Sequence, residues 1–519
     1  MSNNEQQVLA SQRGETAKRG YFPLSYRDGF SQWWASISPA AAEHKVLSYI
    51  PYLGTPPTQQ ATGNTATKAA DSLDPTAGEN AGANDSDDVS RTVSHTASSE
   101  NDPYGPRKWH STLVKLPGKD RAVNEFSVER VGEDVDNTFV MLHGYGAGLG
   151  FFYKNFEPLS RRENWRLYAL DMLGMGRSSR PPFRIHSKDK EGKIREAENW
   201  FVDALEEWRV ERKIERFTLL GHSLGGYMAV CYALKYPGRL NKLILASPVG
   251  IPEDPYAMQE PMPDAGGEDG VGDMAQEEMS NGKDGNNFLN SKSKGTNANA
   301  NTPAKRPYSK WFTWLWDQNV SVFSFVRWSG PLGPRLVSGW TSRRFSQMPQ
   351  EEASALHDYS YSLFRQRGSG EYALSYVLAP GAYARSPLIR RIGQIGRGTY
   401  IPSEIGPTVA AKESTSATTA EEKLAKVKEN GLPVVFMYGD GDWMDKKGGY
   451  AGMEKLAESK KEAQSEHVTT NIRADQSDSK VLIVKGAGHH LYLDGYKQFN
   501  EMMLDEMKDV ERRQKESKI

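Results

Sequence analysis

The chain has 519 residues, enough for one large domain or two ordinary ones, and its formal net charge of −1 gives no global argument for binding nucleic acid. The single cysteine, Cys231, excludes an internal disulfide framework and a cysteine-rich metal site, and it suits a reducing compartment better than secretion. No uninterrupted apolar run reaches the roughly 18 residues of a membrane-spanning helix, so we expect any contact with lipid to be peripheral.

The N-terminal segment, residues 1–53, lacks the apolar core of a signal peptide, and its small excess of basic residues is only weakly typical of a mitochondrial transit peptide. Ser38 can cap a helix that runs to about Tyr49, and Trp33 and Trp34 precede that helix. Two interpretations stay open for this segment: a helix docked onto the body of the protein, or an attachment to a membrane surface.

Four segments have the composition of disordered chain, because they are rich in small polar residues and poor in large apolar ones. They are residues 54–102, 257–307, 407–422 and, less clearly, 456–479. We therefore expect a linker at 54–102, the first part of a core at 103–250, a cap domain at 251–400 that carries the insert 257–307, and the second part of the core at 401–519.

Outside these segments, short apolar runs alternate with stretches of helical spacing. The runs are TFVML (138–142), WRLYALD (165–171), FTLLG (217–221), KLILAS (242–247), PVVFMYG (433–439) and KVLIVKG (480–486). Nearly all-apolar strands that alternate with helices predict an α/β fold with a mostly parallel sheet buried on both faces. The runs before residue 131 predict an antiparallel entry to that sheet.

A catalytic serine is indicated between the run 217–221 and the following helix, where the sequence reads Gly221-His222-Ser223-Leu224-Gly225. This is G-x-S-x-G at a strand-to-helix turn, where glycines permit a tight turn that exposes the serine. The following helix directs free N–H groups and a positive dipole end toward a forming oxyanion. We expect Ser223 to be a nucleophile, with the backbone N–H groups of Leu224 and Tyr145 as the oxyanion hole.

A serine nucleophile needs a histidine base and an acid that orients it, each after a later strand. His489 follows the last run in KGAGHH and is the expected base, whereas we expect the adjacent His490 to pack or to contact substrate. Asp442 is the expected acid because it lies shortly after PVVFMYG, and Asp445 remains its alternative. The glycine-rich turn after Asp171 predicts a shaped loop beside the site, since the third glycine and the helix of a dinucleotide-binding loop are missing.

Together these motifs resemble a known family. HGYGAG (143–148), DMLGMGRSSRP (171–181), GHSLGGYMA (221–229), YGDGDWMD (438–445) and GAGHHLYLD (486–494) are similar to α/β hydrolases that include fungal mitochondrial cardiolipin-specific deacylase and the mammalian lipid-droplet lipase co-activator and lysophospholipase. The resemblance runs from about residue 30 to 510. It implies an α/β-hydrolase fold with a helical cap inserted before the acid-bearing strand, phospholipid acyl chemistry, and a mitochondrial, inner-membrane-associated location, with cytoplasm or lipid droplets as the alternative.

His489 and Asp494 also form the H-x-x-x-x-D pattern of glycerolipid acyltransferases. Asp is a favoured N-cap, and a helical apolar face follows Asp494, so we interpret this residue as a helix cap. The pattern therefore identifies the family better than it proves acyl transfer.

The cap sequence KWFTWLWDQNVSVFSFVRW (310–328) predicts a lipid-contacting surface, because tryptophan at this density suits an acyl-chain or membrane interface. Four arginines that accompany it could bind a phosphate, although each is more often a surface charge: Arg327, Arg335, Arg343 and Arg344.

The sequence thus favours a serine acyl hydrolase of phospholipids. Two alternatives stay open, an acyl-CoA-dependent lysophosphatidic acid acyltransferase and a lipid-surface co-activator of another lipase. No metal or organic cofactor is implied, although acyl-CoA would be the co-substrate of an acyltransferase. The expected partners are a phospholipid or lysophospholipid and a membrane or lipid surface.

Overall fold

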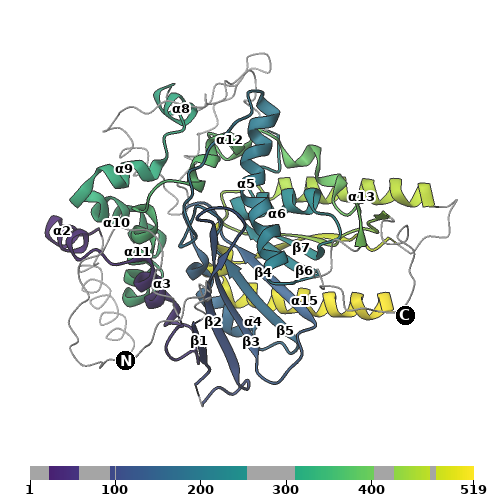
Figure 1. The fold of residues 1–519 in the computed structure, drawn as a ribbon, viewed down its shortest axis with the longest axis horizontal. Coiled ribbons are helices and arrows are strands. Elements are labelled where there is room, and N and C mark those ends of the chain that lie inside the picture. The colour runs from purple at the N-terminus through teal and green to yellow at the C-terminus, as the bar shows by residue number, and fades with distance from the viewer. Residues whose placement is uncertain are drawn as a thin grey trace, which may run out of the picture.

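A nine-stranded sheet forms the centre of the computed structural model, which describes residues 23–57, 94–99, 101–253, 310–402, 426–467 and 475–518 (Figure 1). The predicted disordered segments 257–307 and 407–422, and most of 54–102, lie outside the described residues. Of the described helices, none combines the length and apolar character needed to cross a bilayer.

The strands lie in the order β1-β2-β3-β5-β4-β6-β7-β12-β13. Pairing is antiparallel from β1 to β5 and parallel from β5 to β13, so the predicted antiparallel entry and parallel centre are confirmed. The strands are β1 (Ser94–Ala97), β2 (Arg107–Lys115), β3 (Ala122–Arg130), β4 (Asn137–Leu142), β5 (Trp165–Leu170), β6 (Phe217–His222), β7 (Leu240–Ala246), β12 (Val434–Gly439) and β13 (Ser479–Val484). Two small ribbons, outside the main sheet, pair β8 (Leu378–Ala379) with β9 (Tyr383–Ala384) and β10 (Thr399–Tyr400) with β11 (Val427–Lys428).

Each face of the sheet carries its own hydrophobic core. On β4, Val140 and Leu142 belong to one core and Phe139 and Met141 to the other, as the alternation of side chains along a strand requires. The first core is completed by α5 (Lys190–Glu211), α6 (Leu224–Lys235) and α13 (Lys447–His467). The second is completed by α4 (Tyr153–Leu159), α14 (Leu491–Asp494) and α15 (Tyr496–Lys518). This burial on both faces explains why the strands read as continuous apolar runs.

Two predicted disordered ranges contain regular structure. Helix α13 covers the first half of 456–479, where Leu456 and Ala463 are buried although most of its residues are polar. Strand β1 lies within 54–102 and pairs antiparallel with β2. A polar surface helix resembles disordered chain in composition, and an edge strand is held by its backbone hydrogen bonds, so composition could not identify either element.

The described part of the predicted cap consists of residues 310–402 and lies between β7 and β12 in the chain. Its elements are α8 (Lys310–Asp317), α9 (Val322–Trp328), η2 (Gly330–Leu332), α10 (Gly333–Arg344), α11 (Gln350–Phe364), η3 (Gly370–Ala373), α12 (Leu374–Val377), η4 (Leu388–Arg390) and η5 (Ile392–Gln394). Helices α9, α10 and α11 contribute side chains to the second core, which joins the cap to the sheet. The first 3-10 helix, η1 (Leu149–Phe152), follows β4 and belongs to the same core.

The N-terminal segment forms two helices with different surroundings. In α3 (Pro39–Leu47), Ser38 caps the helix by accepting from the Ala41 N–H at 3.2 Å, and Val46 and Leu47 are buried in the second core. Lys45 bonds Asp358 on α11 at 2.7 Å. Helix α3 is therefore docked, whereas α2 (Tyr26–Ala35) leaves its aromatic side chains largely exposed.

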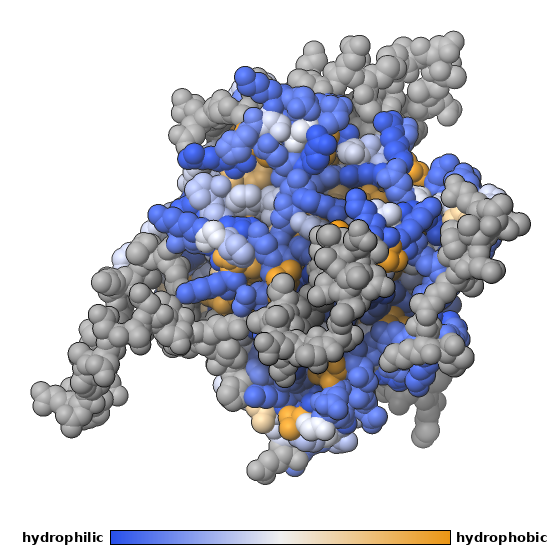
Figure 2. Space-filling view, turned by 45° about the vertical axis from the view of Figure 1, so that its right-hand side comes forward, coloured by the Kyte–Doolittle hydropathy of each residue, from blue (hydrophilic) through white to orange (hydrophobic). Residues whose placement is uncertain are grey.

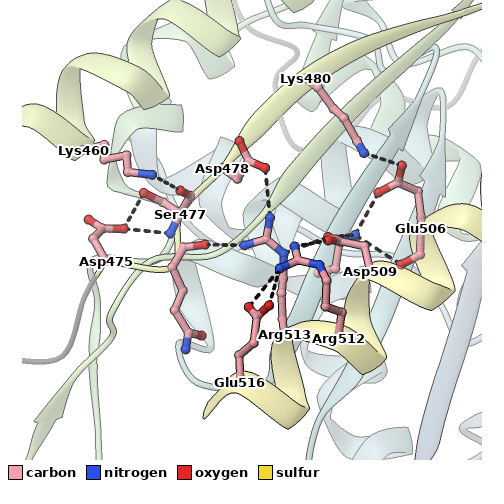
Figure 3. Close-up of polar contacts among 12 residues, drawn as sticks. Lys460, Asp475, Ser477, Asp478, Lys480, Glu506, Asp509, Arg512, Arg513 and Glu516 are labelled. Atoms are coloured by element: carbon pink, nitrogen blue, oxygen red, sulfur yellow. Dashed lines mark hydrogen bonds and ion pairs between the residues drawn. The ribbon is translucent and has the colours of Figure 1, made fainter. Parts of the chain in front are cut away.

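A group of paired charges fixes α15 to β7, β13 and the loop before β13, and we call it the carboxy-terminal charge cluster (Figure 3). Its members are Lys242, Asp478, Lys480, Glu506, Asp509, Arg512, Arg513 and Glu516. The Lys242 side chain is only 1% exposed and bonds Glu506 at 2.8 Å and Asp509 at 2.6 Å. Although burial raises the pKa of Asp509, hydrogen bonds from Lys242, Arg513 and Arg512 hold that pKa well below its ordinary value.

Candidate active site

Ser223 lies at the sharp turn between β6 and α6, where its backbone has φ 53° and ψ −115°. A Cβ on Gly221 would meet the Gly225 carbonyl oxygen at 2.3 Å, and a Cβ on Gly225 would meet the His143 oxygen at 2.5 Å. The turn therefore admits only glycine at both positions, and it holds Ser223 in a strained conformation of the kind found at functional sites.

Ser223, His489 and Asp442 form a hydrogen-bonded chain. Ser223 Oγ lies 3.0 Å from His489 Nε2, and His489 Nδ1 lies 3.1 Å from Asp442 Oδ1. With a neutral imidazole, this arrangement has Nδ1–H donating to the carboxylate and Nε2 accepting from the hydroxyl. The Trp443 ring packs against the His489 ring at 4.8 Å between centroids. The three residues come from the loops after β6, β12 and β13, at the carboxyl edge of the sheet.

Asp445, the alternative acid, lies elsewhere. It is exposed and accepts from the backbone N–H of Lys447 at the start of α13, at 2.9 Å. The Asp442 side chain is 1% exposed, and its Oδ1 also accepts from the Met444 N–H at 3.0 Å. The other oxygen of Asp442 is buried without a hydrogen-bond partner among the described residues.

The loop after β4 lies against the serine, as expected for an oxyanion hole. A Cβ on Gly144 would lie 3.0 Å from Ser223 Cβ, so the Gly144-Tyr145 backbone passes directly beside the nucleophile. Leu224 is the first residue of α6, where backbone N–H groups have no acceptor within the helix. The structure thus brings Tyr145 and Leu224 to Ser223.

The glycine-rich turn after Asp171 supports this loop. Asp171 is fully buried, and its Oδ1 accepts from the Leu149 N–H at 2.7 Å while its Oδ2 accepts from the Arg177 N–H at 2.8 Å. His143 Nε2 accepts from the Met172 N–H at 3.1 Å, and burial lowers the pKa of His143. The prediction of a shaped loop beside the site is confirmed.

Two further histidines surround His489. His222 Nε2 donates to the His489 carbonyl oxygen at 3.0 Å, and burial, with the nearby His489, holds the pKa of His222 well below its ordinary value. Burial and the adjacent Arg344 likewise lower the pKa of His490, whose Nδ1 accepts from Arg344 Nε at 3.2 Å. Both are neutral and packed, which agrees with the expectation for His490.

The prediction that Asp494 caps the last helix is wrong. Asp494 Oδ1 accepts from Arg344 Nη1 at 2.8 Å, and its Oδ2 accepts from the Gly488 N–H at 3.2 Å. The carboxylate thus faces back toward the His489 loop instead of forward onto α15. Arg344 lies 150 positions away in the chain, so no local pattern could identify this pairing.

A small apolar cavity of about 70 Å³ adjoins Ser223 and His489. Its walls combine core and cap aromatic residues: Tyr145, Phe151, Phe323, Trp340, Phe364 and Trp443. The tryptophans predicted to contact lipid differ in exposure. Trp316 is buried and donates to the Leu378 oxygen, whereas Trp314 and Trp328 are exposed. The side chain of Trp311 lies outside the described residues.

The arginines proposed for phosphate binding are mostly engaged by protein groups. Arg327 bonds Glu371 at 2.8 Å, and Arg335 donates to the Leu24 carbonyl oxygen at 3.0 Å. Arg344 has one terminal nitrogen, Nη2, that is buried without a partner among the described residues. In the part of the chain that the structure describes, no group of three or more His, Cys, Asp or Glu residues is placed to hold a metal ion.

Comparison with known proteins agrees with the fold. Residues 137–269 match the model of the alpha/beta hydrolase fold family. A 1-acylglycerol-3-phosphate O-acyltransferase of Arabidopsis thaliana is 32% identical over 317 residues, which cover 60% of this chain and 56% of that protein. The matches to this plant relative and its rice counterpart span less than two thirds of the relatives' own length.

Two human relatives are covered more fully. The 1-acylglycerol-3-phosphate O-acyltransferase ABHD5 is 31% identical over 294 residues, covering 55% of this chain and 68% of that protein. The (lyso)-N-acylphosphatidylethanolamine lipase is 27% identical over 402 residues, which cover 76% of this chain and 86% of that protein. The solved structure of a thermophilic esterase from Thermogutta terrifontis is 13% identical in sequence, with a TM-score of 0.41. The match covers 77% of this chain and 98% of that esterase. The sequence matches and the sheet order agree, and the chain belongs to the α/β-hydrolase family.

Proposed function

We propose that this protein is a serine acyl hydrolase that removes ester-linked acyl chains from phospholipids. The observation that carries the proposal is the hydrogen-bonded chain from Ser223 through His489 to Asp442, with separations of 3.0 and 3.1 Å. The names of the relatives, acyltransferases and a lipase, support lipid esters as the substrate class.

In this reaction Ser223 Oγ attacks the ester carbonyl carbon while its proton passes to His489 Nε2. Asp442 accepts the Nδ1–H bond and stabilises the imidazolium that forms. The backbone N–H groups of Tyr145 and Leu224 bind the negative oxygen of the tetrahedral intermediate, where one such donor is worth about 3 kcal/mol. His489 then gives its proton to the leaving lysophospholipid oxygen, and an acyl ester remains on Ser223.

The acceptor of that acyl group decides between the two enzyme classes. Water, activated by His489, releases a fatty acid and completes hydrolysis. A lysophospholipid hydroxyl instead forms a new phospholipid, and acyl-CoA then supplies the acyl group with coenzyme A thiol as the leaving group. The acyltransferase names of several relatives favour this second candidate specifically.

The cavity beside Ser223 fits such a substrate only in part. Its volume of about 70 Å³ is well below the roughly 300–1,000 Å³ of pockets that enclose drug-sized ligands. An acyl chain therefore requires displacement of the aromatic walls, of which Phe323, Trp340 and Phe364 belong to the cap.

We further propose that the protein reaches its substrate by resting an aromatic surface on the lipid. Helices α2 and α9 both contact η2 and α10, and they lie at the same end of the molecule (Figure 1). Phe30 and Trp34 belong to α2, and Trp328 ends α9. Trp34 is 74% exposed and Trp328 is 59% exposed. Figure 2 shows that the face drawn there is mainly hydrophilic, with only scattered hydrophobic patches. Exposed tryptophans with a charged residue nearby, here Arg335 against the Tyr26 ring, suit a lipid headgroup layer.

Point substitutions test this surface better than truncation, because α3 in the same segment is part of the core. Vesicles of anionic phospholipid should bind the Trp34→Ser/Trp328→Ser double variant at least tenfold more weakly, with hydrolysis of a soluble ester unchanged. Tyr450→Ser, an exposed aromatic on α13, is the matched control and should bind normally. Equal binding by all three proteins would refute the surface.

We propose cardiolipin as the first phospholipid to test and the mitochondrial inner membrane as the location. Both proposals rest on the resemblance to cardiolipin-specific deacylase. Cytoplasm or lipid droplets are the alternative. Imaging of the chain with a C-terminal fluorescent tag, together with a mitochondrial and a lipid-droplet marker, distinguishes them.

The deciding experiment is product analysis of the wild-type and Ser223→Ala proteins against a phospholipid panel, with and without acyl-CoA. Fatty-acid release that Ser223→Ala loses supports the hydrolase, and acyl-CoA consumption with phosphatidic acid formation supports the acyltransferase. If the wild type has neither activity and a fluorophosphonate probe fails to label Ser223, the third alternative, a non-catalytic co-activator, replaces both. Full fatty-acid release by Ser223→Ala would overturn the serine mechanism.

A further inference from the structure

Arg344 connects the cap to the loop that carries the proposed base. It ends α10, and its side chain is only 3% exposed. The guanidinium reaches two residues after β13, donating from Nε to His490 Nδ1 at 3.2 Å and from Nη1 to Asp494 Oδ1 at 2.8 Å. One side chain of the cap thus holds two residues that follow His489 in the chain.

Asp494 continues the connection toward the triad. Its second oxygen accepts from the Gly488 N–H at 3.2 Å, and Gly488 immediately precedes His489. On the other side of the loop, the His489 carbonyl oxygen accepts from His222 Nε2 at 3.0 Å. The backbone on both sides of the His489 side chain is therefore fixed, once by Asp494 and once by the residue before Ser223.

The same contacts determine the state of His490. Because Arg344 Nε–H is a donor, His490 Nδ1 must be the acceptor and Nε2 must carry the proton. A neutral His490 with this tautomer lines the cavity beside Ser223, with its ring 5.6 Å from the His489 ring. It is placed to donate a hydrogen bond, and it does not compete with His489 as a base.

Stability alone is a poor reason for this arrangement. A buried ion pair contributes little net stability, because desolvation offsets the attraction between its charges. Here one guanidinium nitrogen, Arg344 Nη2, is also buried without a partner among the described residues.

We propose that Arg344 and Asp494 are positioning residues for the serine reaction, which together hold the His489 loop and fix the His490 tautomer. The inference rests on the proposed function, since it assumes that His489 serves Ser223. Asp494, the aspartate of the H-x-x-x-x-D pattern, thus orients His489. Both of its carboxylate oxygens are occupied by hydrogen bonds, so it takes no direct part in acyl transfer. Its bond to Arg344 also makes the geometry of the triad depend on the position of the cap.

The test compares Asp494→Asn, Arg344→Met, Arg344→Lys and the Arg344→Met/Asp494→Asn double variant with wild type. Asp505→Asn, an exposed aspartate on α15, is the matched control. The readouts are the rate of fluorophosphonate labelling of Ser223, kcat and KM for a soluble short-chain ester between pH 5 and 9, and the unfolding temperature.

We expect Asp494→Asn to lower kcat and the labelling rate about tenfold with KM changed less than twofold. The charged groups near His489 are Asp442, Arg344 and Asp494, and the neutral titratable groups are His222 and His490. Asp494→Asn leaves the Arg344 cation without its carboxylate and disfavours a protonated His489, so the acidic limb of kcat/KM should move to lower pH by about half a unit or more. Arg344→Met leaves the carboxylate alone and should move it to higher pH. The double variant should return the limb near its wild-type position, and Arg344→Lys should restore part of the rate.

Three results would overturn the inference. Asp494→Asn could label at the wild-type rate with an unchanged pH profile, or both single variants could shift the acidic limb in the same direction. Asp494→Asn could also lose only transfer from acyl-CoA, which would give Asp494 a direct role. Failure of the proposed function would give different results. The probe would not label wild-type protein, or the Ser223→Ala variant would be active.

Discussion

Two buried polar regions of this molecule differ in how completely their atoms are paired. In the carboxy-terminal charge cluster, no buried side-chain nitrogen or oxygen lacks a hydrogen-bond partner. Around Ser223, six described buried atoms lack a partner: His222 Nδ1, Trp340 Nε1, Arg344 Nη2, Asp442 Oδ2, Trp443 Nε1 and Tyr492 Oη. An unpartnered buried polar atom costs free energy, so such atoms indicate a site where something other than stability is selected. The comparison predicts that substitutions in the charge cluster change stability and that substitutions around Ser223 change activity.

The largest effect should come from Asp442→Asn. The amide lacks the negative charge that stabilises the imidazolium, and its NH2 group can donate to His489 Nδ1 and favour the wrong tautomer, so kcat should fall roughly ten-thousandfold. The unfolding temperature should stay the same or rise, because the substitution removes a buried negative charge, one of whose oxygens has no hydrogen-bond partner among the described residues. Asp445→Asn is the matched control and should keep kcat within about twofold. A larger loss for Asp445→Asn than for Asp442→Asn would mean that the acid is misassigned.

The next largest effect should come from Lys242→Met, which removes the buried cation at the centre of the charge cluster. Removal of one partner leaves Glu506 and Asp509 less compensated, and urea denaturation should show a loss of about 3–4 kcal/mol in the free energy of unfolding. Ester hydrolysis per folded molecule should not change. Lys508→Met, whose side chain is exposed, serves as the control, and a catalytic defect in Lys242→Met would show that the two regions are coupled.

A pH effect should follow from Glu43, which packs α3 against the loop after β5. Burial raises the pKa of this carboxyl to about 7, partly opposed by Arg177, which it contacts at 2.5 Å, and reinforced by Asp171. Between about pH 4.5 and 7 the folded state keeps a proton that the unfolded state releases, so stability falls as pH rises through this window and levels off above it. The difference corresponds to at most about 3 kcal/mol.

Glu43→Gln should remove this slope, measured as the free energy of unfolding at pH 4.5, 6 and 7.5. Asn124 and Tyr359 also contact the carboxyl, and an amide preserves hydrogen bonding to them. An identical slope in wild type and variant would assign the pH dependence to another group.

The smallest effect should be Glu516→Gln. Glu516 and Arg512 pair along α15 with side chains that are more than half exposed, and such pairs contribute about 0.3–0.5 kcal/mol at most. Added salt should remove the difference from wild type. A loss above about 1 kcal/mol would mean that the exposed rim of the charge cluster is as important as its buried centre.

The parts that sequence predicted well are those that depend on local geometry. The turn at Ser223 needs glycines at Gly221 and Gly225 whatever the rest of the chain does, and the loops after β12 and β13 bring Asp442 and His489 beside it. The alternation of apolar runs likewise predicted the parallel sheet, because burial on both faces determines composition directly.

The parts that sequence missed depend on distant partners or on polar surfaces. Asp494 was assigned to the helix that follows it, since its true partner, Arg344, lies in the cap. The composition of 456–479 predicts disorder, although half of this range belongs to helix α13, because a helix that buries only a narrow stripe is mostly polar. The N-terminal segment looked like one unit, yet α3 is buried by contacts with α11 and α2 is exposed, a difference that only the tertiary structure defines.

The docking of α3 also sets the timing of folding during synthesis. Lys45 and its partner Asp358 are 313 positions apart, and Glu43 is likewise covered by Tyr359 of the cap. At translation rates of about 5–20 residues per second, α3 emerges about 15 to 60 s before its partner helix exists. During that interval the apolar side chains of α3, which include Val46 and Leu47, have no native surface to cover them. The apolar side chains of α3 therefore stay exposed on the nascent chain until the cap is made, and we expect the docking of α3 to be a late step in folding.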